Sequence, residues 1–156
     1  MPNDSVHYKR ARFSTRLPGD RRYTAAHYWL FEEGPGIWRV GFTKFATRML
    51  GDIVEYNFGV TQGDQITLGQ EIGSIEGFKA LTALYSVAQG EFLGIGDDLG
   101  SDITLVESDP YGRGWLYRLK GQPDPASMDV RGYVGILDAT IDRLLESRHS
   151  TGETQR

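Results

Sequence analysis

The chain has 156 residues and a mass of 17.5 kDa, which is room for one domain with a substantial core. Its aromatic content of 12% argues against a disordered chain, and the lack of cysteine excludes disulfides, thiolate metal sites and thiol chemistry by the chain itself. The net charge of −4 is uneven: residues 1–22 hold six basic and two acidic side chains, whereas the remainder holds 11 basic and 19 acidic ones, a poor surface for nucleic acid.

The first segment, residues 1–22, is expected to be a solvated and mobile basic arm. Two other interpretations stay open, namely a contact with RNA or lipid and a short organelle presequence. Pro2, Asp4 and Pro18 interrupt the amphipathic pattern of a presequence, which favours the arm. No apolar run in the chain approaches the roughly 20 residues of a membrane-spanning helix.

Short apolar stretches between 20 glycines indicate a mainly β domain with many turns. Gly34-Pro35-Gly36 has the composition of a turn between the first two strands. The expected strands are Tyr28–Glu32, Ile37–Phe42, residues 54–58, residues 81–87 and Trp115–Leu119. Alternation in the fourth of these strands predicts a single apolar face formed by Leu81, Ala83, Tyr85 and Val87.

Two segments follow a helical period instead. In the first, residues 43–50, Thr43 can cap the helix and Gly51 can end it. The second runs from Ser127 to about Glu146, with Ser127 or Asp129 as its cap, residues 122–126 as a linker before it and residues 147–156 as a frayed tail. Its apolar stripe should pack on the chain's own barrel, in preference to a second subunit, through Val130, Val134, Leu137, Ile141 and Leu144.

The usual catalytic motifs are absent from the sequence. There is no Gly-x-Ser-x-Gly elbow, no glycine-rich run ending in Lys-Ser or Lys-Thr, and the three histidines are too scattered for a zinc site. Asp97-Asp98 is best interpreted as a solvated turn, and His27 as a hydrogen-bonded structural histidine. We therefore predict no catalytic residue and no metal ligand.

Lysine is rare, since the chain has 13 arginines and only four lysines. One of them, Lys79, stands in Glu76-Gly77-Phe78-Lys79-Ala80, between two strand-like stretches. Gly77 permits the positive φ that a tight hairpin turn can require, so we expect Lys79 at a hairpin tip.

Motifs on both sides of Lys79 stand in a fixed order. They are Gly41-Phe42-Thr43-Lys44-Phe45-Ala46-Thr47-Arg48-Met49-Leu50-Gly51-Asp52-Ile53-Val54, then Gly63-Asp64 with Gly69, then Glu76-Gly77-Phe78-Lys79-Ala80, then Asp109-Pro110-Tyr111-Gly112-Arg113-Gly114-Trp115-Leu116. Over residues 23–120 the chain thereby resembles the glycine cleavage system H-protein family of lipoyl carriers. The resemblance implies a mainly β barrel-sandwich hybrid, like a lipoyl domain. With the helices expected at residues 43–50 and 127–146, the predicted fold has short peripheral helices and a C-terminal helix.

The resemblance also implies the site and the cofactor. Lipoic acid would be attached as an amide to Lys79, in a turn recognised through Glu76, Gly77, Phe78 and Ala80. The domain organisation would be a basic arm at 1–22, a lipoyl carrier domain at 23–120, and a linker, amphipathic helix and tail at 121–156.

The function implied is that of a carrier and not of an enzyme. A lipoate-attaching enzyme would first join lipoic acid to the lysine. The resulting lipoyl arm would carry an aminomethyl group from glycine decarboxylase (P-protein) to aminomethyltransferase (T-protein), and dihydrolipoamide dehydrogenase (L-protein) would reoxidise it. No nucleic acid or membrane partner is expected, a monomer is favoured over a dimer, and the bacterial cytoplasm is favoured over the mitochondrial matrix. The acidic body predicts docking to basic entrances on the partners.

Some positions depart from the family pattern. The family's glutamate in His-Glu-Trp is Tyr28, the proline of its Tyr-Ser-Pro is Val87, and the asparagine of a downstream turn is Gly96. Two alternatives therefore stay open: a related lipoate-binding protein that serves a heterodisulfide-reductase-like sulfur-oxidation pathway, and an unlipoylated interaction module on the same scaffold.

Overall fold

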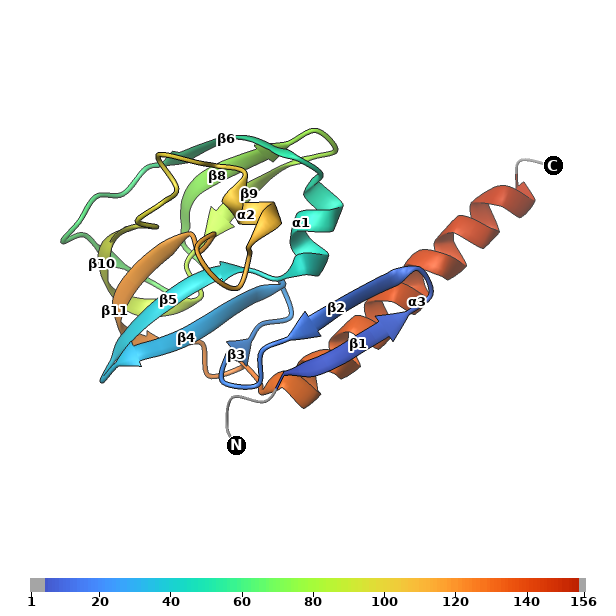
Figure 1. The fold of residues 1–156 in the computed structure, drawn as a ribbon, viewed down its shortest axis with the longest axis horizontal. Helices are drawn as coiled ribbons and strands as arrows, with labels where there is room; N and C mark the ends of the chain where they lie inside the picture. Colours follow the sequence, from blue (N-terminus) through green and yellow to red (C-terminus); the bar gives the residue numbers. More distant parts are fainter. Residues whose placement is uncertain (1–4, 155–156) are drawn as a thin grey trace.

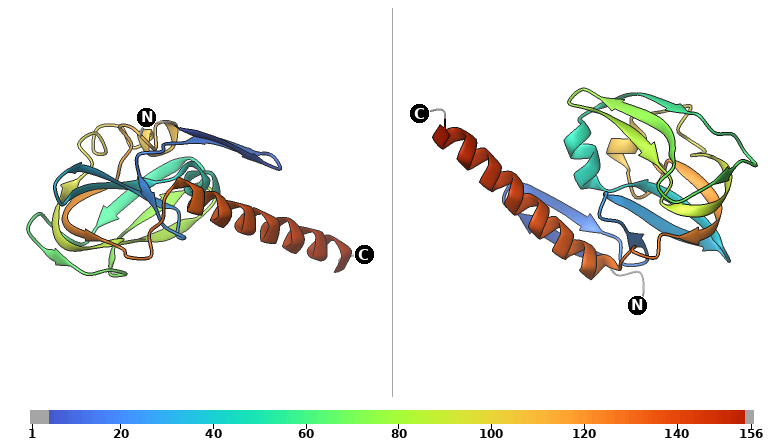
Figure 2. Two further views of the ribbon diagram at one scale, coloured as in Figure 1. Left: turned by 90° about the horizontal axis from the view of Figure 1, so that it is seen from below. Right: turned by 180° about the vertical axis from the view of Figure 1, so that it is seen from behind.

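The computed structural model describes residues 5–154 of the chain, with side chains as far as Arg148. Figure 1 shows two layers of β-sheet that wrap around a common interior, with a hairpin and a long helix extending from one side. The two extending elements come from opposite ends of the sequence and lie side by side in Figure 1 and in the right view of Figure 2.

The larger sheet has six antiparallel strands in the spatial order β3-β4-β5-β11-β10-β7. These are β3 (Arg22–Tyr23), β4 (Tyr28–Gly34), β5 (Ile37–Phe42), β7 (Gln65–Ile66), β10 (Ala88–Ile95) and β11 (Tyr117–Pro123). The smaller sheet has the order β6-β8-β9, with β6 (Ile53–Phe58), β8 (Glu71–Gly77) and β9 (Leu81–Tyr85). Helix α1 (Lys44–Leu50) follows β5, and the short helix α2 (Leu105–Ser108) lies between β10 and β11.

The core of the domain lies between the two sheets. Leu30, Val40 and Leu119 from the larger sheet and Ile75 and Leu84 from the smaller one are all completely buried in one apolar cluster. Side chains from both inner faces therefore fill a common interior, which confirms the expected mainly β barrel-sandwich fold with peripheral helices. No helix within residues 5–154 is long and apolar enough to cross a membrane.

The expected mobile arm at the N-terminus is wrong for most of its length. Strands β1 (Val6–Arg10) and β2 (Phe13–Leu17) form an antiparallel hairpin, closed by a turn in which Ala11 has a φ of 53°. Its inward face buries Tyr8, Phe13 and Leu17. The basic side chains of Lys9, Arg12 and Arg16 are exposed, whereas Arg10 turns toward α3. The period of two was present in the sequence, but the many charges among these residues hid it.

The C-terminal helix, α3 (Val130–Thr154), begins later and ends later than expected. Asp129 caps it, because the backbone N–H of Gly132 donates to Asp129 Oδ1 at 2.9 Å, so the alternative cap at Ser127 is excluded. Residues 147–154 continue the helix where a frayed tail was expected, and residues 155–156 lie outside the described part.

The buried face of α3 differs from the predicted stripe. Tyr133, Leu137 and Ile141 are buried, whereas Leu144 is 41% exposed. This face packs within the chain, as expected, and its cover is the β1–β2 hairpin together with Phe45 and Trp29. The buried face of α3 is decided by the hairpin that covers it, and the apolar period of the helix alone does not indicate that partner.

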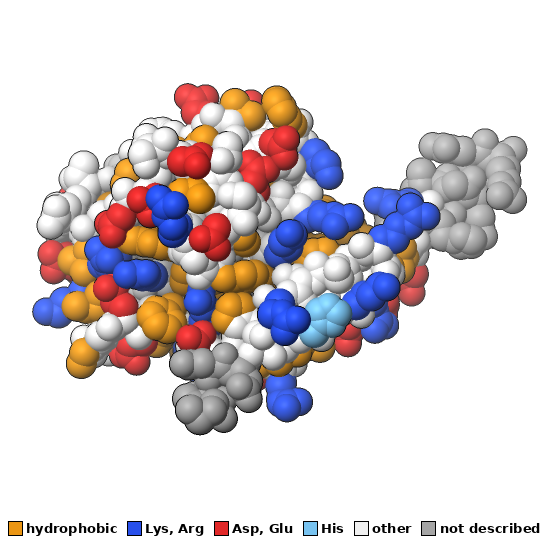
Figure 3. Space-filling view, viewed as in Figure 1, with side chains coloured by type: hydrophobic (Ala, Val, Ile, Leu, Met, Phe, Trp, Pro, Cys, Tyr) orange, Lys and Arg blue, Asp and Glu red, His pale blue; other side chains and the backbone are white. Residues whose placement is uncertain are grey.

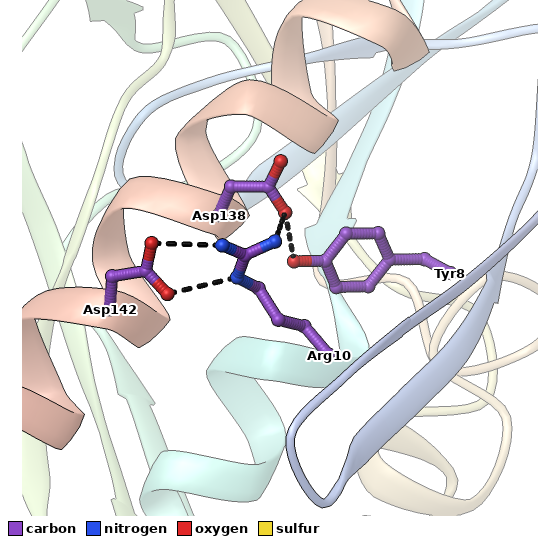
Figure 4. Close-up of polar contacts among 4 residues, drawn as sticks. All are labelled: Tyr8, Arg10, Asp138 and Asp142. Carbon is purple, nitrogen blue, oxygen red and sulfur yellow. Dashed lines mark hydrogen bonds and ion pairs between the residues drawn. The ribbon is translucent and has the colours of Figure 1, made fainter.

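Polar contacts pin the hairpin to α3 (Figure 4). Arg10 donates from Nε and Nη2 to the two carboxylate oxygens of Asp142, both at 2.9 Å, and from Nη1 to Asp138 at 3.2 Å. The Tyr8 hydroxyl donates to the same Asp138 oxygen at 2.7 Å. The Arg10 guanidinium lowers the pKa of Asp142 by this hydrogen bond. Two-point geometry of this kind fixes the register of the hairpin along the helix.

The apolar face predicted for residues 81–87 is also wrong. Leu84 is completely buried, whereas Leu81 and Tyr85 are 69% and 42% exposed. Leu81 and Leu84 point to opposite faces of this strand, so its pattern is compatible with burial of either face. Thr82 pairs with the buried Ile75 across the sheet, and Leu84 lies on the same face as Thr82, so this is the face that is buried. Leu81 and Tyr85 are consequently left on the outside of the domain.

Candidate functional site

Lys79 lies in the connection between β8 and β9, at one end of the smaller sheet. Phe78, Lys79 and Ala80 form this connection and are all exposed, with Phe78 exposed to 80%. The hairpin is closed by a hydrogen bond from the Gly77 N–H to the Ala80 carbonyl at 2.9 Å. The expected exposed position of Lys79 between two strands is therefore what the structure has.

The backbone of this tip is held against the C-terminal end of α1. The Lys79 N–H donates to the Leu50 carbonyl at 2.8 Å, and the Phe78 N–H donates to the Asp52 carbonyl at 3.0 Å. The last carbonyls of a helix have no partner within the helix, so the tip satisfies one of them. The turn is thus fixed to the body of the domain at two points and is stiffer than a free hairpin end.

Gly77 has a role different from the expected one. It is not among the residues with positive φ and ends strand β8 in an extended conformation. A Cβ placed on it would lie 2.2 Å from the Leu50 carbonyl oxygen. Glycine is needed here because the two backbones approach closely, and the positive φ falls instead at Gly51, with φ 78°, where α1 ends.

The Lys79 side chain lies along the end of α1. Its Nζ donates to the Arg48 carbonyl at 3.4 Å, and its Cγ would be 3.0 Å from a Cβ on Gly51. The negative end of a helix attracts an ammonium group, and formation of an amide would remove that charge. Modification at Nζ would therefore weaken the contact that holds the side chain on the helix.

A hollow of about 390 Å³ flanks Lys79 on the side of α2. Asp52 and Glu107 lie in its wall, and the Glu107 carboxylate accepts a hydrogen bond from the Ile53 N–H at 2.8 Å. Burial, together with the neighbouring Asp52, raises the pKa of Glu107. Arg48, Asp52 and Glu107 were not singled out from the sequence, although Gly51-Asp52 belongs to one of the quoted motifs.

Glu76 is the exposed acidic residue three positions before Lys79. Its Cα pairs with that of Leu81 on β9 and with that of Glu55 on β6, and Glu55 is exposed as well. Two carboxylates directly opposite each other in a sheet are mildly destabilising. The fold therefore gives Glu76 no structural benefit that would explain its charge.

The other lysines are not presented on tight turns. Lys44 begins α1, as expected, and Lys9 lies in β1. Lys120 directly follows the strand expected at Trp115–Leu119, but it lies inside β11, where its Cα pairs with that of Glu91. A primary amine on a tight turn thus occurs at Lys79, and an exposed amine on a rigid tip fits covalent attachment of a carboxylic acid such as lipoate.

The three departures from the family pattern each have a structural partner. The hydroxyl of Tyr28 accepts from the Tyr85 N–H at 3.0 Å, and burial raises the pKa of Tyr28 to about 12. The N–H of Val87, which proline would lack, donates to the Tyr117 hydroxyl at 3.2 Å. Gly96 is needed because a Cβ there would lie 2.1 Å from the Trp115 carbonyl oxygen. These changes affect packing and do not alter the tip.

The remaining candidates do not form a second site. Asp98 pairs with Arg113 at 3.1 Å, which lowers the pKa of Asp98, and this agrees with a solvated turn. Within residues 5–154 no group of three or more His, Asp or Glu side chains could hold a metal ion. His27 Nδ1 lies 2.8 Å from the hydroxyl of Tyr133, which in turn lies 2.7 Å from Thr43 Oγ1, so His27 is the structural histidine expected.

We predict that His27 makes folding sensitive to acid. Burial lowers the pKa of His27 to about 4, whereas an unfolded histidine titrates near 6.5. Between these two values the unfolded state binds more protons, so the free energy of unfolding should fall as the pH drops, by up to roughly 3 kcal/mol over the whole window. Denaturant titrations of the wild type between pH 7 and 4 measure this loss.

The matched control is His27→Asn, because asparagine tolerates the φ of 73° at this position and does not titrate. The variant should lose less stability than the wild type between pH 6.5 and 4. If the free energy of unfolding fell equally with pH in the two proteins, the acid sensitivity would come from carboxylates and not from His27.

Comparison with known proteins gives a consistent result. The profile of a family described as Glycine cleavage H-protein matches residues 21–130. A glycine cleavage system H protein of Alteromonas mediterranea is 36% identical over 128 residues, covering 80% of this chain and 98% of that protein. One from Mycolicibacterium vanbaalenii is 36% identical over 125 residues, covering 80% of this chain and 92% of that protein.

A solved structure is similar as well. The crystal structure of a glycine cleavage system H protein from Mycobacterium marinum superposes with a TM-score of 0.68 at 30% sequence identity. It covers 76% of this chain and 97% of that one. The hairpin at residues 6–17 and nearly all of α3 lie outside the residues that the family profile matches.

Proposed function

On the premise that this chain belongs to the glycine cleavage H-protein family and is a lipoyl carrier of the glycine cleavage system, we propose that Lys79 is the residue that carries its lipoyl group. The observation that supports Lys79 is its place on a rigid, exposed tip, with the backbone N–H bonded to the Leu50 carbonyl and the side chain accessible. An attaching enzyme can reach such an amine without unfolding any part of the domain.

The chain's own contribution is to position and present the arm. Lysine adds a flexible four-carbon stem, and α1 and β6 fix the turn from which it starts. The bound lipoyl group supplies the redox-active sulfur chemistry that a chain without cysteine lacks. We infer that the protein is not itself a catalyst and that each reaction takes place in a partner's active site.

The partners that we propose are those of the glycine cleavage system. Glycine decarboxylase would load the aminomethyl group, aminomethyltransferase would receive it, and dihydrolipoamide dehydrogenase would reoxidise the arm. A lipoate-attaching enzyme would modify Lys79 beforehand. We place the protein in the bacterial cytoplasm as a monomer, and glycine catabolism and one-carbon metabolism as its context.

Intact-mass measurement tests the proposal directly. Protein isolated from its native host should carry the mass of one lipoyl group, and peptide mapping should locate it on Lys79. An unmodified mass would favour the interaction module without lipoate. A lipoylated Lys79 in a protein that cannot accept an aminomethyl group from the decarboxylase would favour the sulfur-oxidation pathway.

Glu76 gives a separate prediction about recognition. Glu76→Ala removes an exposed carboxylate near the tip and relieves its opposition to Glu55, so the melting temperature should stay within the range of ordinary surface substitutions. The rate of lipoate attachment should nevertheless fall. Glu55→Ala is the matched control, because it removes the partner carboxylate from a strand that does not enter the turn. Equal attachment rates in the wild type and Glu76→Ala would leave Glu76 without a role in recognition.

A further inference from the structure

A second hollow flanks Lys79 on the side away from α2. It is a groove of about 890 Å³ between the turn of the β1–β2 hairpin, helix α1 and helix α3. Two of its three walls come from residues outside the family match, namely the hairpin and α3.

The floor of the groove is apolar and partly open to solvent. Met49 on α1 is 47% exposed, and Leu144 and Leu145 on α3 are 41% and 45% exposed. Helix α3 extends beyond the end of the hairpin (Figure 1), and no described part of the chain covers these leucines completely. A set of aliphatic side chains left open in this way favours an interaction partner.

The rim of the groove is basic. Arg12 at the hairpin turn, Arg48 on α1 and Arg148 on α3 line it, and none of the three forms an ion pair with a described residue. Arg10 lines it too but is neutralised by Asp138 and Asp142. No acidic side chain of the described part is among the lining residues, and blue side chains gather around orange ones where the hairpin meets α1 and α3 (Figure 3).

We propose that this groove docks a segment of a partner enzyme whose apolar side chains are flanked by carboxylates, and that it does so on an enzyme that acts on the Lys79 arm. The inference rests on the proposed function, because Lys79 lines the groove and links it to the arm. On the groove side of Lys79 the charge is thus opposite to that of the acidic body, so the expectation of basic entrances on all partners does not extend to this side. Complementary charge around a small apolar contact gives fast and reversible association, as a shuttle needs.

Two other occupants fit the groove less well. An uncharged lipoyl arm would gain nothing from the three basic side chains on the rim, and a hollow of about 890 Å³ is several times larger than such an arm requires. A second copy of this chain would bring two basic rims together, which is repulsive. A protein segment that carries carboxylates uses both the floor and the rim.

Charge reversal on the rim tests the proposal. Arg12→Glu combined with Arg148→Glu in the lipoylated full-length chain should weaken binding to at least one of the three glycine cleavage enzymes by about 10-fold, and more at low than at moderate salt. The matched control is Arg16→Glu with Arg143→Glu, which makes the same charge change on the same two elements, at exposed residues outside the groove. Binding of the control should stay within about 2-fold of the wild type.

A second variant tests the floor of the groove. Leu144→Ser with Leu145→Ser should weaken binding to the same enzyme while leaving the melting temperature nearly unchanged, because both side chains are already exposed. Equal losses in the rim pair and the control pair would show a general charge effect and overturn the proposal. So would unchanged binding in both pairs.

The alternatives have their own signatures. If lipoate attachment shifts the methyl resonances of Leu144 and Leu145 while the rim variants bind normally, the groove holds the arm and the proposal fails. If sedimentation shows a dimer that the leucine variants dissociate, the groove holds a second copy, and the proposal fails as well. Intact mass is measured on every sample, so that a failure of lipoylation at Lys79 is distinguished from a failure of the groove.

Discussion

Lys79→Arg should abolish lipoate attachment completely. Arginine keeps the charge and length of the side chain, but its guanidinium stays protonated and cannot form the lipoyl amide. Because Lys79 is exposed and its backbone N–H still bonds to Leu50, the fold should not change. Intact mass of the variant, produced in a strain with active lipoylation, measures the loss, and the melting temperature should match that of the wild type.

The matched control for this experiment is Lys120→Arg. Lys120 is also exposed, but it lies within β11 and not on a turn, so its replacement should leave the lipoyl mass intact. Any lipoyl group found on the Lys79→Arg protein would overturn the assignment. Peptide mapping would then show which of Lys9, Lys44 and Lys120 had been modified.

Gly77→Ala should be strongly destabilising. The added methyl carbon would lie 2.2 Å from the Leu50 carbonyl oxygen, and backbone on both sides of the contact cannot rotate away as a flexible side chain could. We expect a loss of about 2–4 kcal/mol, comparable with severe overpacking, and a fall in melting temperature of roughly 2–4 °C per kcal/mol. The tip should also separate from α1, so the rate of lipoate attachment should fall.

Gly34→Ala provides the control for the second experiment. Gly34 ends β4, has no heavy atom within 4 Å of an added Cβ, and should lose much less stability. If Gly77→Ala retained both the melting temperature and the attachment rate of the wild type, contact between the tip and α1 would not be needed for either property.

Local patterns in the sequence predicted a large part of the fold and the site. Strands β4 and β5 and their turn were found because alternation and the Gly34-Pro35-Gly36 turn act over a few residues. Helix α1 was found with its Thr43 cap and Gly51 end, because capping is decided by immediate neighbours. The position of Lys79 on a connection between two strands followed from the same local reasoning.

Long-range contacts were beyond such reasoning. The hairpin β1–β2 is ordered because α3 covers it, and the pairing of Arg10 with Asp142 joins residues 132 positions apart. Neither segment alone indicates its partner, so the first appeared as a mobile arm and the second as a helix on the barrel. Likewise, the choice of which face of β9 is buried depended on whether Leu81 or Leu84 packs in the core.

The sequence by itself determined the chemistry of this protein: a chain without cysteine, four lysines, one of them between two strand-like stretches, and motifs in a fixed order around it. Only the tertiary structure decided how that lysine is held and what lies beside it. The need for glycine at position 77 comes from the approach of the Leu50 carbonyl, and the basic groove arises where the hairpin, α1 and α3 converge. Both depend on backbone and side chains that are distant in sequence, and a pattern within one segment carries no information about such contacts.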